Sequence, residues 1–370
     1  MSGITPYLKL MVDKGGSDLF LSVGARPQMK IEGKAVPIGQ TPLDPTTIGA
    51  LAASIMDTKQ QQQFEATLEL NTGFSANGIG RFRANLYHQR GQIAIVLRHI
   101  KQSIPSIEAL GLPAVLAELV LKQRGLLLVV GATGSGKSTT LAAMLDYRNE
   151  NCGGHILTIE DPIEFLHQHK RSVVDQREVG IDTLSYGEAL KNALRESPDV
   201  IMIGEVRDAE TMQHALHFSE TGHLCLATLH ASNANQALER VVNFFPEDTR
   251  DHALQDLALH LQAIVSQRLV RGLDAKRVAA VEVLINSPTI ADYIENGRIG
   301  DLKDFMEKQT VEGIQTFDQS LYALYEANQI DAKEAVRNAD SQHNVRMRIE
   351  FAHPGTFANA EAPDLSIGES

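Results

Sequence analysis

The chain is poor in cysteine, with two among its 370 residues. Cys152 and Cys225 lie far apart in the sequence and form no C-x-x-C pair. A disulfide framework and a tetracysteine zinc module are therefore excluded, and reduced thiols in a cytoplasmic protein are expected.

Long apolar runs are missing as well. No window approaches the roughly 18–20 apolar residues that a membrane-spanning helix needs. Residues 1–16 lack the apolar stretch of a signal peptide and reach Asp13 early. The sequence therefore predicts no signal peptide and no membrane span, so that any association with a membrane would go through a partner.

An excess of basic residues is also absent, since the formal net charge is −12. Residues 1–100 carry ten Lys and Arg against seven Asp and Glu, a balance of +3, whereas the remainder carries 24 against 39, a balance of −15. Proteins that bind nucleic acid usually present a basic face. The acidic main part of the chain therefore argues against a nucleic-acid partner.

The length of the chain predicts two domains, because 370 residues exceed what one hydrophobic core usually covers. Residues 1–100 contain short β-type runs broken by Gly and Pro, with a helical pattern at 46–66, which predicts a small α+β domain. Two of its strands are expected to join at Gln89–Gly91. Residues 101–113, which include two prolines, are expected to form a linker.

From residue 114 onward the pattern changes to an alternation of strands and helices. Near-continuous apolar runs are typical of strands that are buried on both faces of a parallel sheet, and they occur at 126–130, 155–160, 199–204 and 224–229. Ser185 and Asp208 are N-capping residues that begin helices between these runs. The alternation predicts a doubly wound α/β domain.

Beyond residue 245 the sequence predicts mostly helix. We expect a long amphipathic helix at 249–269, one more strand at 277–285 and several short helices in 288–338. The second domain is expected to span 114–345. Residues 346–370 are expected to be a disordered tail, because their end is acidic, rich in small residues and without periodicity.

A phosphate-binding motif occupies residues 131–138, where GATGSGKS matches G-x-x-x-x-G-K-[ST] in full. It follows an apolar strand and precedes a helix, whose N-terminus favours phosphate. We expect Lys137 to reach the β and γ phosphates of ATP and Ser138 to ligate Mg²⁺. The expected nucleotide-binding residues are Gly131, Ala132, Thr133, Gly134, Ser135, Gly136, Lys137, Ser138 and Thr139.

Acidic residues follow two of the predicted strands. Ligands of open α/β sheets bind outside the carboxyl ends of the strands, so Glu160, Asp161 and Glu205 are expected beside the phosphate loop as Mg²⁺ ligands with Ser138. Glu164 is expected to orient or deprotonate the water that attacks the γ-phosphate. Asp161 fits equally well as a cap of the next segment. Glu205 is also a candidate catalytic residue.

Positive and titratable groups complete the set of candidates. His230 ends a buried strand at the same edge and could sense the γ-phosphate, whereas His223 begins that strand. Arg81 and Arg83 share one face of a strand, and with Arg98 they are candidate arginine fingers, which would make catalysis depend on domain or subunit closure. Arg195 and Arg207 are further candidates.

These motifs together resemble the secretion-superfamily ATPases. TIEDPIEF is similar to the Asp box of that family, IGEVRD to its Glu-type Walker B motif, and GHLCLATLHAS to its His box. GGSDLFL and RFRANLY resemble the type IV pilus retraction ATPases of the PilT/PilU family. Within that family RVVNFFPE and NADS are more similar to the PilU branch, and IADYIENGRI departs from the PilT-like helix.

The resemblance implies a PAS-like N-terminal α+β domain, followed by a RecA-like P-loop ATPase domain with a helical C-terminal part. It implies a cytoplasmic homohexamer that hydrolyses ATP with Mg²⁺, located peripherally at the inner-membrane base of the pilus. The implied partners are a PilT-like retraction ATPase and the PilC-like inner-membrane platform protein. The implied role is powering or assisting pilus retraction and hence twitching motility.

Two alternatives share these residues. A type II or type IV secretion ATPase would use the same chemistry for a different cargo. An ATP-binding accessory scaffold would depend on a partner ring for motion. Intact Lys137, Glu164 and Glu205 favour hydrolysis, whereas the altered helix at 290–299 favours dependence on a partner.

Overall fold

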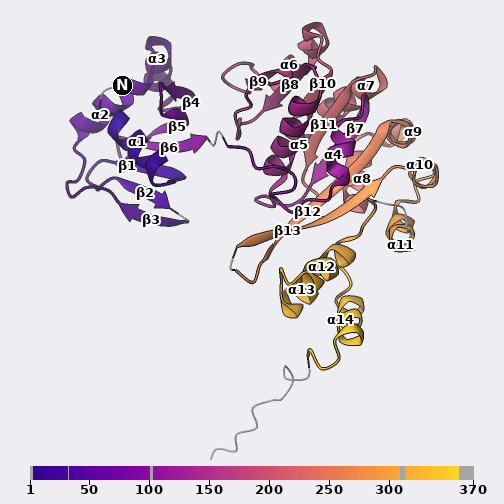
Figure 1. Cartoon of the computed structure of the whole chain (residues 1–370). Coiled ribbons are helices and arrows are strands. Elements are labelled where there is room, and N and C mark those ends of the chain that lie inside the picture. Colours follow the sequence, from indigo (N-terminus) through magenta and orange to yellow (C-terminus); the bar gives the residue numbers. More distant parts are fainter. Residues whose placement is uncertain (1–2, 32, 101–102, 275, 309–312, 358–370) are drawn as a thin grey trace, which may run out of the picture. The chain divides into compact units, whose positions relative to one another are not determined.

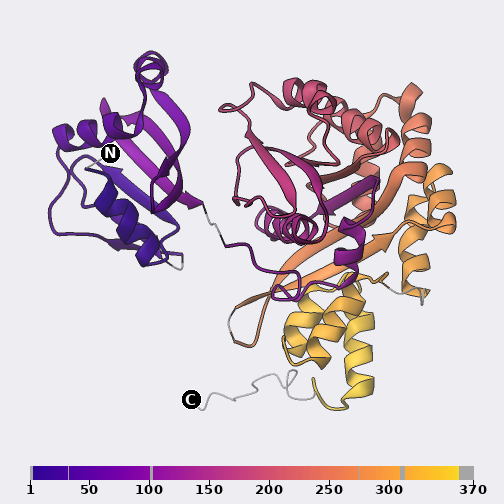
Figure 2. The ribbon, with the colours of Figure 1, turned by 45° about the horizontal axis from the view of Figure 1, so that its top comes forward.

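The chain forms two compact units (Figures 1 and 2). The computed structural model describes residues 3–357, apart from 32, 101–102, 275 and 309–312. Unit 1 comprises Met1–Ser103 and Ile163–Leu166, and unit 2 comprises Ile104–Pro162 and His167–Ser370.

Unit 1 is built on a six-stranded antiparallel sheet with the order β3-β2-β1-β6-β5-β4. Its strands are β1 (Asp18–Ser22), β2 (Gln28–Ile31), β3 (Lys34–Pro37), β4 (Glu69–Ala76), β5 (Gly80–Gln89) and β6 (Gln92–Ile100). Its helices are α1 (Thr5–Asp13), α2 (Pro45–Ile55) and α3 (Thr58–Thr67). The predicted α+β class is confirmed.

The local signals of unit 1 explain its elements. Buried and less buried residues alternate along β4 and β5, as expected for strands with one face on a core. Arg90 and Gly91 join β5 to β6 with φ of 52° and 75°, a two-residue hairpin at the predicted position. The helical stretch at 46–66 is two helices, because Asp57 caps α3 in a capping box with Gln60.

Unit 2 contains a seven-stranded sheet with the order β13-β12-β7-β11-β10-β8-β9 (Figure 1). Its strands are β7 (Gly125–Val130), β8 (Gly154–Glu160), β9 (Ser172–Glu178), β10 (Val200–Ile203), β11 (Leu224–Leu229), β12 (Leu261–Arg271) and β13 (Arg277–Ile285). Leu126 and Leu128 pack in one hydrophobic cluster, and Leu127 and Val129 in another. The sheet is therefore covered on both faces, as predicted.

Helices follow most of these strands. They are α4 (Val115–Val120), α5 (Lys137–Asn151), α6 (Tyr186–Ala193), α7 (Ala209–Glu220), α8 (Ala234–Phe244), α9 (Arg250–His260), α10 (Pro288–Glu295), α11 (Leu302–Lys308), α12 (Phe317–Glu326), α13 (Ala332–Asn338) and α14 (Gln342–Ala352). Ser185 and Asp208 accept a hydrogen bond from the backbone N–H three residues on, and therefore cap α6 and α7 as predicted.

The predicted long helix at 249–269 is wrong in its second half. The helix α9 ends at His260, and the chain continues directly into β12. This strand pairs parallel with β7 and antiparallel with β13, so it lies inside the sheet. A short apolar run fits a buried helix or a buried strand equally well, and the pairing decides between them. The strand β9 at the other edge of the sheet was not predicted.

The ends of unit 2 differ from the predicted boundaries. Within the predicted linker at 101–113, Ile107 and Leu112 are buried in a cluster with residues of the sheet. The predicted tail begins inside α14, which continues to Ala352 because Ile349 is buried against α12 and α13. Residues 358–370 of the predicted tail lie outside the described residues.

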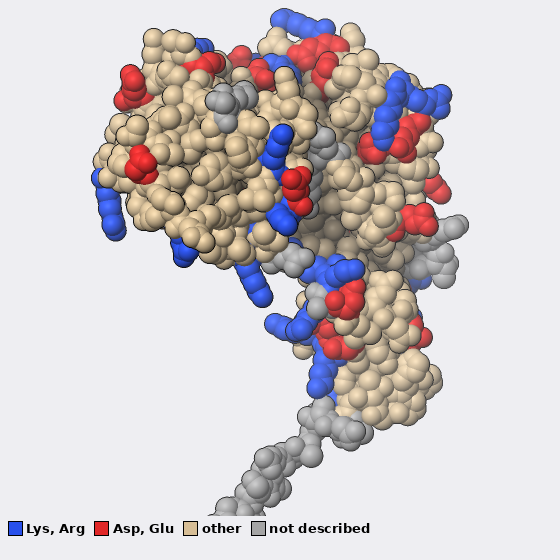
Figure 3. Space-filling model, turned by 60° about the vertical axis from the view of Figure 1, so that its left-hand side comes forward, with Lys and Arg blue, Asp and Glu red and all other residues tan. Residues whose placement is uncertain are grey.

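None of the helices in the described part of the chain combines the length and the apolar character that crossing a bilayer requires. On the face shown in Figure 3, basic and acidic side chains are interspersed.

The packing of α14 leads to a stability prediction. Ile349→Ala should lower the free energy of unfolding by about 2–5 kcal/mol, because it opens a cavity at a fully buried site. Met347 is 56% exposed on the same helix, so Met347→Ala should change stability by less than about 0.5 kcal/mol. Urea unfolding of both variants measures the difference. Equal effects would show that α14 contributes no packed core.

Candidate active site

The carboxyl ends of four parallel strands meet at one edge of the sheet in unit 2. The strand β7 pairs parallel with β11, β11 with β10, and β10 with β8. The phosphate loop, Glu205 and His230 follow β7, β10 and β11, and Glu160 is the last residue of β8. The structure therefore brings these residues to one edge, whereas Arg195 lies before β10, where it donates to Asn192 at 3.2 Å.

The phosphate loop connects β7 to α5. Residues 131–136 form the turn, and Lys137 begins the 15-residue helix. The Lys137 ammonium donates to the carbonyl oxygens of Gly131 at 2.8 Å and Ala132 at 3.0 Å. It is thus held over the loop, where it can exchange these carbonyls for phosphate oxygens.

The loop is supported by Gln267 from β12, a residue that the sequence analysis missed. Gly136 has φ of 96°, and a Cβ there would lie 2.8 Å from the Gln267 side-chain nitrogen. The Gln267 side-chain oxygen Oε1 accepts a hydrogen bond of 2.6 Å from the Thr140 hydroxyl on α5. Gly136 therefore permits a close approach that fixes the loop against the sheet. The wrong helix prediction for this segment hid the contact.

A cavity of ≈ 340 Å³ opens beside the loop. Its lining combines backbone of the phosphate loop with two arginines from β12 and β13, and comprises Ala132, Thr133, Gly134, Ser135, Ser232, Gln267, Arg268, Leu269, Arg277 and Asn338. The Arg268 guanidinium stacks on the Phe317 ring at 3.9 Å and pairs with Asp340 at 2.7 Å. One wall of this cavity is therefore held by the C-terminal helices.

Glu205 is the charged centre of the edge. Arg207 donates to it from Nε at 2.9 Å and from Nη2 at 2.7 Å, and His230 Nε2 lies 3.0 Å from its other oxygen. Burial favours the neutral acid, but Arg207, with His230 and Lys137, holds the pKa of Glu205 below its ordinary value. Glu205 is therefore ionised at neutral pH.

The acids that follow β8 have different surroundings. Glu160 is 8% exposed and accepts hydrogen bonds from Thr158 at 2.7 Å and Gln176 at 3.1 Å. Asp161 is more exposed and lies 3.7 Å from Arg207. Glu164 is exposed, with no hydrogen bond or ion pair from its side chain to any residue in the described part of the chain, and it belongs to the segment grouped with unit 1.

Tyr186 is a second residue that the sequence analysis missed. A Cβ on Gly204 would lie 2.9 Å from its hydroxyl and 3.2 Å from the Glu160 backbone, so glycine is required between β10 and Glu205. Burial, with the charge of Asp161, raises the pKa of Tyr186. Tyr186 is therefore a protonated hydrogen-bond donor beside the acids.

The predicted finger arginines lie together in unit 1. Arg81 and Arg83 alternate with the core residues of β5, and Arg83 lies opposite Arg98 on β6. Arg98 pairs with Asp18 at 2.8 Å. Arg81 has a buried Nε without a hydrogen-bond partner among the described residues. Arg98 is thus engaged within its own unit, and Arg81 and Arg83 are the better candidates.

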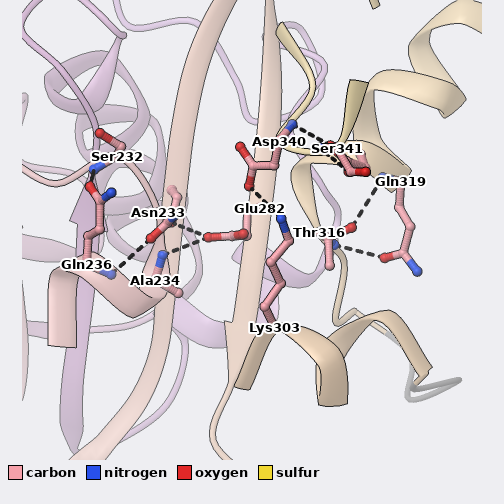
Figure 4. Close-up of polar contacts among 12 residues, drawn as sticks. Ser232, Asn233, Ala234, Gln236, Glu282, Lys303, Thr316, Gln319, Asp340 and Ser341 are labelled. Carbon is pink, nitrogen blue, oxygen red and sulfur yellow. Dashed lines mark hydrogen bonds and ion pairs between the residues drawn. The ribbon is translucent and has the colours of Figure 1, made fainter. Parts of the chain in front are cut away.

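The segment after His230 is fixed by a buried carboxylate (Figure 4). Glu282 on β13 is 3% exposed and accepts hydrogen bonds from the Ala234 backbone N–H at 2.7 Å and the Ser266 hydroxyl at 2.9 Å. Asn233 caps α8 beside it. Burial raises the pKa of Glu282. The start of α8, and with it the chain leaving His230, is therefore held to the sheet.

The donor set fits a hard cation. Ser138 lies in the first turn of α5, and Glu160, Asp161 and Glu205 supply carboxylate oxygens, the ligand type that Mg²⁺ prefers. Among the described residues no group of three or more His, Cys, Asp or Glu side chains could hold a metal by itself. Glu160, Asp161 and Glu205 therefore do not form such a group, and their assignment as Mg²⁺ ligands together with Ser138 stays a prediction.

Comparison with known proteins shows the family to which the chain belongs. The family model described as type II/IV secretion system protein matches residues 54–356. The chain is 52% identical to the type IV pilus ATPase PilU of Pseudomonas aeruginosa, over 93% of this chain and 90% of that protein. It is 41% identical to the type IV pilus retraction ATPase PilT of the same organism, over 92% and 99% of the two chains.

A solved structure is similar over almost the same length. The crystal structure of the pilus retraction motor PilT with bound ADP matches with a TM-score of 0.85 at 41% identity, covering 91% of this chain and 97% of that one. The similarity confirms the fold expected from the motifs.

The contacts of Glu205 lead to a prediction for pH dependence. Arg207→Ala removes the cation that keeps the pKa of Glu205 low. The pKa should rise, so the acidic limb of the pH profile for nucleotide hydrolysis should move to higher pH. Hydrolysis rates measured between about pH 5 and pH 9 check the shift.

Arg298→Ala is the matched control for this prediction. Arg298 donates to Asp301 from Nε at 2.9 Å and from Nη2 at 2.7 Å, the same geometry at a site away from the phosphate loop. Its removal should leave the profile unchanged. An unshifted acidic limb in Arg207→Ala would remove Glu205 from the groups that control hydrolysis.

Proposed function

This chain belongs to the type II/IV secretion system protein family and is a P-loop ATPase, and we propose that it powers or assists type IV pilus retraction as a subunit of a homohexameric motor. The observation that carries the proposal is the shared edge, where Lys137, Glu205 and His230 lie together in a chain that is 52% identical to PilU. Twitching motility would follow from retraction.

The hydrolysis step follows from the contacts at this edge. Lys137 and the N-terminus of α5 hold the β and γ phosphates of ATP. When bound, Mg²⁺ offsets charge on the phosphate oxygens, with Ser138, Glu160, Asp161 and Glu205 as the residues that would hold it or its waters. His230 donates from Nε2 to the ionised Glu205 carboxylate and would sense the γ-phosphate from this position.

Glu164 is the residue that we assign to the attacking water. Its carboxylate is exposed and has no described partner, so it is available to accept a proton or to orient water. Glu160, in contrast, is nearly buried and engaged by Thr158 and Gln176. From these different surroundings we assign Glu160 to holding the cation or its waters and Glu164 to activating the attacking water.

The partners that we propose are a second, PilT-like retraction ATPase and the inner-membrane platform protein of the pilus. The chain would act in the cytoplasm, peripherally at the pilus base. The segment 290–299, which includes most of α10, departs from the PilT-like pattern. This departure supports an accessory role, in which motion depends on the partner ring. A type II or type IV secretion ATPase is the remaining alternative.

Turnover by the purified protein tests the enzymatic assignment. Glu164→Gln should retain MgATP binding but hydrolyse ATP about 10²–10⁴-fold more slowly, the usual contribution of a general base. Lys137→Ala should lose turnover altogether, because no charge then contacts the β and γ phosphates. Steady-state hydrolysis and nucleotide affinity measure both. Wild-type rates in Glu164→Gln would move the water-activating role to Glu205.

Pilus retraction in cells tests the biological role. In a strain without its other retraction ATPase, an independent motor supports retraction and an accessory subunit does not. Restoring the partner should then restore retraction that still requires Lys137. Retraction that is indifferent to this chain in both strains would favour the secretion alternative.

The arginines of unit 1 give a separate prediction. If Arg81 and Arg83 meet charge that develops on the γ-phosphate, replacing both with Ala should lower turnover much more than ATP affinity, since such fingers contribute ~10³–10⁵ in rate in related chemistry. The single variants should show smaller losses. A double variant within about twofold of wild type would assign both arginines to an ordinary surface.

A further inference from the structure

One glutamine joins the two ends of the acid-bearing loop. Gln176 on β9 donates from its side-chain nitrogen to Glu160 at 3.1 Å. Its side-chain oxygen accepts a hydrogen bond of 2.9 Å from the His167 backbone N–H. Since a backbone N–H only donates, the amide oxygen faces His167, and the amide nitrogen therefore faces Glu160. Gln176 therefore contacts the two residues that flank the segment 161–166, Glu160 before it and His167 after it.

The sheet fixes where this amide lies. Thr158 on β8 is the register partner of Gln176 on β9. Successive side chains alternate between the faces of a strand, so Thr158, Glu160 and Gln176 share one face. The same Glu160 oxygen accepts from Thr158 at 2.7 Å and from Gln176. Glu160, which precedes the loop, thus accepts hydrogen bonds from two side chains on two paired strands.

The returning end is anchored to the same unit. Asn149, which is fully buried at the end of α5, donates to the Gln168 carbonyl at 2.6 Å and accepts from Lys170 and Ser172. The Val174 backbone N–H donates to His169 at 3.0 Å. Residues 168–174 are therefore hydrogen-bonded to α5 and to one another. Gln176 links the His167 backbone, at the start of this stretch, to Glu160.

From these contacts we propose that Gln176 is a positioning residue for hydrolysis, which holds Glu160 and the His167 backbone and thereby fixes both ends of the segment 161–166 that carries Asp161 and Glu164. The inference rests on the proposed function, because it assigns Gln176 to the same step as Glu164. Gln176 acts by holding the acids within the narrow geometry that proton transfer requires, where a misplacement of ~1 Å can cost about 10²-fold.

Two variants separate positioning from simple structural support. Gln176→Met keeps the length of the side chain and removes both hydrogen bonds. Gln176→Glu keeps the acceptor for His167 and replaces the donor to Glu160 with a second carboxylate. Gln213→Met is the matched control, because Gln213 is exposed on α7 without a described hydrogen bond. For each purified full-length protein, kcat, KM for MgATP, affinity for ADP and melting temperature are measured.

If Gln176 positions the loop, both of its variants lower kcat by at least about tenfold, a larger change than that in KM or ADP affinity, and both remain folded at the assay temperature. Gln213→Met keeps the wild-type kcat. Unchanged kcat in both Gln176 variants overturns the inference, and so does a parallel loss of affinity and melting temperature. Absence of Lys137-dependent hydrolysis in the wild-type protein would instead refute the proposed function.

Discussion

The parallel pairing of β7, β8, β10 and β11 brings the carboxyl ends of all four strands to one edge of the sheet. Each functional segment of unit 2 leaves the sheet at this edge, so residues that are about 100 positions apart in sequence, such as Lys137 and His230, become neighbours of the same carboxylate, Glu205. The strands are buried on both faces. The edge therefore stands on strands that belong to the core.

Carboxylates beside a phosphate loop would repel the phosphate, so their negative charge has to be balanced by a cation of the protein or of the ligand. Arg207 contacts Glu205 and lies near Asp161, while Thr158 and Gln176 satisfy Glu160. The carboxylates are thus held by contacts within the sheet edge. Charges that are ordered in advance avoid reorganisation during a reaction, which fits the ATP hydrolysis that we propose for this edge.

Three polar side chains from the outer strands of the sheet contact the segments at this edge. Gln267 from β12 supports the phosphate loop, Gln176 from β9 joins the ends of the acid loop, and Glu282 from β13 fixes the start of α8. None of the three belongs to a motif that the sequence analysis used. Each contacts a group on another element of the fold, and one sequence does not show which elements are neighbours.

The sequence by itself determined the two-domain α/β organisation, the phosphate loop and the acids, because near-continuous apolar runs and the GATGSGKS pattern are local signals with local causes. It could not determine that 261–271 is a strand, since a short apolar run satisfies a helix and a buried strand equally, and only pairing with β7 and β13 decides. The contacts of Gln176, Gln267 and Tyr186 could not be predicted from the sequence either. They depend on which strands are neighbours, and long-range pairing is decided by the tertiary structure alone.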